Sequence, residues 1–193
     1  MLKRTLTPFC LGFMLVAGSM TPALIGFDAA YAQALTPQQT QQALVRIRQA
    51  LNTNRNNPAQ LAAQLASLLA NNPQYAALVD QAVAGVNNIS PAMANAIGQG
   101  MAQAVNLLLA AGNTAGATAV NAEVAQVQAA IAANPTSQPG AAAGVQTAYT
   151  TTANTLIAAD TAAGTPAGTA AAAQFASLLS TGTTGGGGSS SRT

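Results

Sequence analysis

One long apolar stretch, residues 90–112, constrains this chain more than any other feature. It lies in a span without a charged residue, between Asp80 and Glu123. Large apolar side chains recur in it at the spacing of one helix face: Met93, Ile97, Met101, Val105 and Leu108. A stripe of amide side chains follows the opposite face: Asn95, Gln99, Gln103 and Asn106. The pattern predicts a helix near 91–111 that buries one face and leaves the other in water.

The same stretch has the length of a transmembrane helix, which needs about 20 mostly apolar residues. Four amides on one face would each need a hydrogen-bond partner inside the bilayer. Gly98 and Gly100 also lower the helix propensity, and much of the apolar content is alanine. We therefore favour the core helix of a soluble bundle over a membrane span or an interfacial or pore-lining helix.

Residues 1–32 have the pattern of a secretory signal peptide. Lys3 and Arg4 precede an apolar run, and small residues end the segment at Ala32. We predict cleavage after Ala32, with Ala34 as the second candidate. Such a leader ahead of an alanine- and glutamine-rich chain is typical of a bacterial exported protein. We expect a periplasmic or extracellular location, and no stable membrane span after the leader is removed.

The residues missing after the leader exclude several kinds of chemistry. Residues 33–193 contain no histidine, cysteine, tryptophan or lysine, since the single cysteine is Cys10. Without cysteine there is no disulfide and no thiolate nucleophile. Without histidine and cysteine the usual zinc, copper and haem ligands are absent, and no Ser-His-Asp triad can form. We expect no cofactor, no metal and no enzymatic activity.

Carboxylates are the main acid–base groups that remain. They are Asp80, Glu123 and Asp160, and nothing in their spacing predicts that any two lie together. Paired carboxylates can hydrolyse glycosides, so an enzyme that uses carboxylates alone stays a third alternative. A calcium site would need a dense acidic loop, which the chain does not have.

The charges are few and nearly balanced. Four arginines follow the leader, and Arg46, Arg48 and Arg55 form their one local cluster. A few like charges usually mark a solvated helix end, and nucleic-acid binding needs a denser basic face, so we expect no nucleic-acid partner. The abundant amides and scarce charges favour association over repulsion.

Capping residues and apolar spacing predict seven helical segments. They are residues 37–51, units that begin at Pro58 and Pro73, the central helix, and residues 115–133, 141–159 and 169–180. Thr36 can cap the first segment, and an asparagine before each of Pro58 and Pro73 can cap the next two. These two units form a short repeat. The repeat is shorter than the roughly 20 to 50 residues of common solenoids, so we favour a helical hairpin or corner.

Apolar stripes recur in the later segments. Residues 115–133 contain Val120, Val124, Val127 and Ile131, the spacing of a helix–helix seam. Residues 141–159 repeat this spacing with Val145, Tyr149, Thr152 and Leu156. Phe175 and Leu178 mark the short last helix. A Gly/Ser-rich tail, residues 181–193, is expected to be flexible.

These patterns predict an all-α domain over residues 33–180. We expect a bundle of five to seven short alanine-rich helices around the helix near 91–111. The function expected is that of an exported, non-enzymatic structural or interaction protein, whose partner is a second copy or another exported protein. The expected interaction face is the amide stripe of Asn95, Gln99, Gln103 and Asn106. The alternative is a membrane-active secreted protein that inserts the 91–111 helix into a bilayer.

Overall fold

The computed structural model describes residues 35–182, and within these residues the chain is all-α. The elements are α1 (Pro37–Thr53), α2 (Pro58–Asn71), the 3-10 helix η2 (Pro73–Leu78), α3 (Val79–Ala84), α4 (Pro91–Ala110), α5 (Thr114–Ala133), α6 (Ala141–Ala163) and α7 (Pro166–Gly182). The predicted bundle is confirmed. The predicted leader, residues 1–32, and all but the first two residues of the predicted tail lie outside the described residues.

Short-range hydrogen bonds start the helices where the capping residues predict. At the start of α1, the backbone N–H of Gln39 donates to Thr36 Oγ1 at 3.3 Å. The N–H of Thr36 donates in return to Gln39 Oε1 at 2.9 Å, which completes a capping box. The side chains of Asn57 and Ser90 cap α2 and α4, each with proline at the first helical position.

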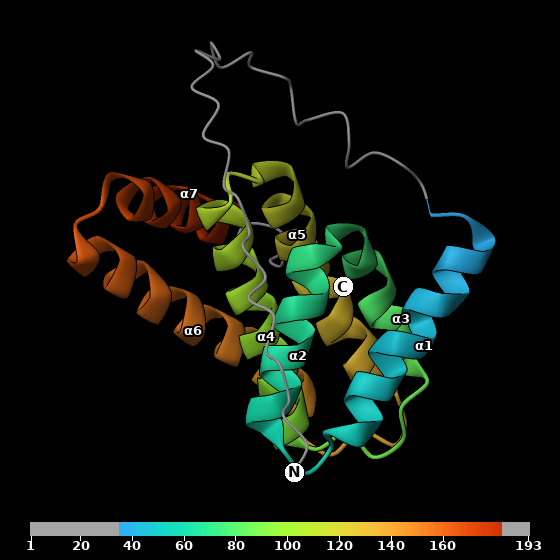
Figure 1. The fold of residues 1–193 in the computed structure, drawn as a ribbon. Helices are drawn as coiled ribbons and strands as arrows, with labels where there is room; N and C mark the ends of the chain where they lie inside the picture. Colours follow the sequence, from blue (N-terminus) through green and yellow to red (C-terminus); the bar gives the residue numbers. More distant parts are fainter. Residues whose placement is uncertain (1–34, 183–193) are drawn as a thin grey trace, which may run out of the picture.

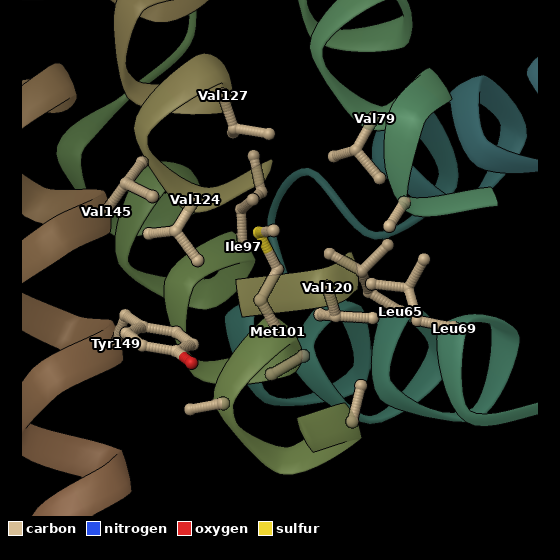
Figure 2. Packing of buried hydrophobic residues seen from close by; sticks show 14 of the residues in the cluster. Leu65, Leu69, Val79, Ile97, Met101, Val120, Val124, Val127, Val145 and Tyr149 are labelled. Carbon is tan, nitrogen blue, oxygen red and sulfur yellow. The ribbon is translucent and has the colours of Figure 1, made fainter. Parts of the chain in front are cut away.

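Helix α4 is the centre of the bundle. It packs against α2, α5, α6 and α7, while α1 lies to one side and α7 to the other (Figure 1). All five of its predicted core residues are buried, and Figure 2 shows Ile97 and Met101 in one cluster with Leu65, Val124 and Tyr149. Small residues on its flanks are buried as well. Helix α4 is therefore buried more widely than a helix with one wet face, because alanine and glycine admit neighbouring backbones.

Two glycines of α4 explain how closely its neighbours approach. A Cβ atom on Gly98 would overlap the carbonyl oxygen of Val145 on α6. A Cβ atom on Gly100 would lie 2.8 Å from the carbonyl oxygen of Ala62 on α2. The sequence marked these glycines only as weak points of a helix. Their role is to let α2 and α6 press against α4 from two directions.

The second unit of the short repeat does not form one continuous α-helix, which corrects the prediction. Residues 73–78 form η2 and residues 79–84 form α3. The Asn72 side chain does not cap η2; its Nδ2 lies 3.4 Å from the carbonyl oxygen of Leu68, at the end of α2. Pro73 and Tyr75 are buried, so tertiary packing shapes this corner. In the first unit, Leu69 is buried whereas the predicted Leu68 is only half-buried.

The last three helices occur in the predicted order, but some of their buried positions and their bounds differ from the prediction. The seam of α5 is confirmed, since Val120, Val124, Val127 and Ile131 are all buried. In α6 the buried residue after Tyr149 is Ala153, while Thr152 is half-buried. Gly164 adopts a left-handed conformation and ends α6, as predicted. Helix α7 begins earlier than predicted and includes Gly168, whose N–H donates to Thr165 Oγ1 at 3.1 Å.

Candidate interaction surfaces

The predicted amide stripe on α4 does not form one open surface. Asn95 is exposed, and its side-chain amide donates to the carbonyl oxygens of Gly144 at 3.1 Å and Pro91 at 3.3 Å. Gln99, Gln103 and Asn106 are half-buried. Neighbouring helices therefore divide the stripe, and its Asn95 end is engaged by α6.

One member of the stripe, Gln103, lines a groove between α2 and α4. The groove has a volume of about 520 Å³. Its α2 wall presents the small side chains of Ala63, Ala66, Ser67 and Ala70. On the α4 wall Leu107 is 50% exposed, which makes it one of two large apolar side chains exposed in residues 35–182. Sequence reasoning missed Leu107 because it directly precedes Leu108 and does not fit the spacing of the apolar stripe of α4.

A second depression lies between α1 and α2. It has a volume of about 390 Å³ and is lined by Arg46, Gln49 and Thr53 from α1 and by Gln64 and Ser67 from α2, with Ala50 and Leu68 as its apolar part. The side chain of Arg46 also borders a smaller depression beside Val45, which is 61% exposed.

The three clustered arginines have different surroundings. The Arg48 guanidinium lies over Gly85, where an added Cβ would meet Nη2 at 3.2 Å. Arg55 is half-buried and donates from Nη2 to the carbonyl oxygen of Asn87. Arg55 is therefore also held by the α3–α4 loop, which folding brings against it.

Two acidic residues lie closer together than their spacing predicts. Burial raises the pKa of Glu123 on α5, and repulsion from Asp80 on α3 raises it further. The two carboxylates come within electrostatic range of each other because α3 packs on α5. Both side chains are only half-buried. Within the described part of the chain, no group of three or more acidic, histidine or cysteine side chains could hold a metal ion.

The tyrosine of α6 is a structural group. Tyr149 is buried, and its hydroxyl donates to Asn121 Oδ1 on α5 at 2.7 Å. Asn121 Nδ2 lies 3.4 Å from the carbonyl oxygen of Leu178 on α7. The Tyr149 ring also meets Phe175 edge to face, with ring centroids 6.2 Å apart. Burial raises the pKa of Tyr149, so the hydroxyl stays protonated as a donor at neutral pH.

Over residues 35–182, every helix falls short of the combined length and hydropathy that a membrane span requires. Comparisons of the chain with protein-family models, curated proteins and solved structures found no match.

Proposed function

We propose that this chain is an exported, non-enzymatic structural protein that associates with a second copy of itself through the α2/α4 groove. The observation that carries the proposal is the exposed Leu107 on the wall of an uncharged groove lined by alanine. A large apolar side chain beside an uncharged, largely alanine-lined depression loses water-exposed surface when a matching surface covers both.

A second copy suits this groove because the protruding Leu107 side chain and the groove lie on the same face of the molecule. In a two-fold symmetric pair, Leu107 of each copy would enter the groove of the other, so that one set of contacts is made twice. Neither α2 nor α4 contains a charged residue, so two copies meet without like-charge repulsion. Gln103 at the groove can exchange amide hydrogen bonds across the pair.

The non-enzymatic part of the proposal is supported by the groups that the chain offers. The acids Asp80 and Glu123 are half-buried on α3 and α5. Tyr149, whose pKa is raised, is engaged with Asn121. No nucleophile is held beside a base in this set, which is what covalent catalysis would need.

The test is the solution mass of the chain, measured by light scattering after size exclusion without detergent. We expect a dimer that Leu107→Arg converts to monomer, because a guanidinium cannot enter an alanine-lined groove without losing its water. The matched control is Val45→Arg, which changes the other exposed large apolar side chain, on α1, and should leave the dimer intact. Helical circular dichroism should be unchanged in both variants.

The amide stripe makes a second, finer test. Gln103→Glu puts a negative charge at the groove and should weaken the dimer, whereas Gln99→Glu, outside the groove lining, should weaken it less. A monomeric wild-type chain, or equal effects of Leu107→Arg and Val45→Arg, would overturn the proposal.

A further inference from the structure

The depression between α1 and α2 is built as a donor-rich pocket. Its polar wall combines one guanidinium, from Arg46, with the hydroxyl groups of Thr53 and Ser67 and the amide groups of Gln49 and Gln64. Its apolar part includes the half-buried Leu68. A volume of about 390 Å³ is at the lower end of the roughly 300–1,000 Å³ of small-molecule pockets. The pocket therefore suits a small ligand with one polar and one apolar end.

A buried side chain orients one of these amides. Asn54, at the end of α1, is a buried amide side chain that is 3% exposed. Its Nδ2 donates to the carbonyl oxygen of Ala50 at 2.9 Å and to Gln64 Oε1 at 2.8 Å. Because the oxygen of Gln64 is the atom held by Asn54, its Nε2 is the end left to donate. Asn54 thus turns Gln64 into a hydrogen-bond donor of the pocket.

The charge distribution gives the pocket a positive sign. The described cations all belong to residues 46–55, whereas the described acids lie on α3, α5 and α6. Helices α1 and α2 contain no acidic residue. Arg48 lies over Gly85 and Arg55 reaches the Asn87 carbonyl, so Arg46 is the arginine that faces the pocket. An oriented amide donor and a guanidinium together match a carboxylate, which accepts from both.

We propose that this pocket binds a small organic carboxylate, with the carboxylate group on Arg46 and Gln64 Nε2 and the apolar end against Leu68. This site is separate from the α2/α4 groove, since only Ser67 borders both. The proposal therefore does not depend on self-association.

Titration of the ¹⁵N-labelled full chain with benzoate, followed by NMR, tests this site. Benzoate carries a carboxylate and an apolar ring, and benzyl alcohol is the neutral analogue of similar size. We expect saturable shifts confined to α1 and α2 with benzoate, including the Arg46 Nε–H and the Gln64 amide, and no saturation with benzyl alcohol. Arg46→Gln should weaken benzoate binding about tenfold, the loss of one charge-assisted hydrogen bond.

Two variants distinguish specific binding of benzoate in the pocket from non-specific attraction by the positive charges of α1. Arg48→Gln removes a positive charge from the same helix but not from the pocket, so the dissociation constant should stay at the wild-type value. Gln64→Glu keeps an acceptor for Asn54 while it places a negative charge in the pocket, so binding should be lost with the fold intact. Non-saturable shifts, equal binding of benzyl alcohol, or equal losses for Arg46→Gln and Arg48→Gln would each overturn the assignment.

Discussion

Gly98 of α4 lies directly against the carbonyl oxygen of Val145 on α6, at a distance that leaves no room for a Cβ atom. This contact joins the two helices backbone to backbone, which a side chain at position 98 would not allow. It also explains why position 98 is glycine rather than a better helix former such as alanine, although alanine is common in the rest of α4.

Gly98→Ala should therefore destabilise the fold even though alanine favours helices. The added methyl group must push α6 away from α4, which we expect to lower the free energy of unfolding by about 3 kcal/mol. The control is Gly85→Ala, whose methyl group would meet only the flexible guanidinium of Arg48. Urea denaturation followed by circular dichroism measures both, and a stable Gly98→Ala variant would contradict the packing described.

Tyr149→Phe tests the hydrogen bond that joins α5 and α6. The change keeps the ring against Phe175 but leaves Asn121 Oδ1 without its donor, so the unfolding free energy should fall by about 1 to 2 kcal/mol. Tyr75→Phe is a matched control, because the Tyr75 hydroxyl makes no hydrogen bond to another group of residues 35–182. The comparison is made by thermal and urea unfolding; equal losses in the two variants would argue against the Tyr149–Asn121 bond.

Asn134 joins the loop before α4 to the end of α5. Its Nδ2 donates to the carbonyl oxygen of Val86 at 2.8 Å, and its Oδ1 accepts from the N–H of Thr136 at 3.0 Å. Asn134→Ala removes both partners and should cost about 2 kcal/mol of stability. The exposed Asn52 at the end of α1 supplies the control, and Asn52→Ala should change stability by less than about 0.5 kcal/mol. Amide hydrogen exchange should show faster opening of the α3–α4 loop in Asn134→Ala alone.

Glu123 makes the stability of this fold depend on pH. Burial and then repulsion by Asp80 raise its pKa in the folded chain. Between the ordinary and the raised pKa the folded state holds more protons than the unfolded state, so stability falls as pH rises through this window. Unfolding by urea at a series of pH values between about 4 and 7 should record this fall.

Two variants show how much of the pH dependence of stability comes from burial of Glu123 and how much from repulsion by Asp80. Glu123→Gln should remove it and stabilise the fold at neutral pH by about 0.5 kcal/mol, a small value because the site is half-exposed and screened. Asp80→Asn should remove only the smaller part, since burial is the larger cause. A pH profile that Glu123→Gln leaves unchanged would be incompatible with this origin.

Sequence spacing was sufficient for the helices whose signals are local. Thr36, Asn57 and Ser90 each bond to a backbone N–H within three residues, so their capping roles depend on little else. The valine seam of α5 and the core stripe of α4 were also predicted, because apolar periodicity indicates which face of a helix is buried. The same signals misled at Asn72, where the expected cap instead approaches the end of the preceding helix.

The candidate surfaces were only partly predictable. The amide stripe named Gln103, but only the positions of α2 and α6 decide that Asn95 is engaged by Gly144 while Gln103 borders a groove. Leu107 carried no periodic signal of its own. The α1/α2 pocket depends on Asn54 reaching Gln64 of the next helix, a pairing that spacing does not encode.

The sequence by itself determined that the domain is all-α and that the apolar stripes of α4 and α5 are buried, because caps and periodicity act within a few residues. Only the tertiary structure decided that Gly98 packs against the backbone of α6, that Asp80 comes within electrostatic range of Glu123, and that Arg46 rather than Arg48 faces a pocket. Those relationships depend on how helices distant in sequence approach one another. In a chain this rich in alanine, many approaches bury similar surface, so the few close backbone contacts at glycine select among them.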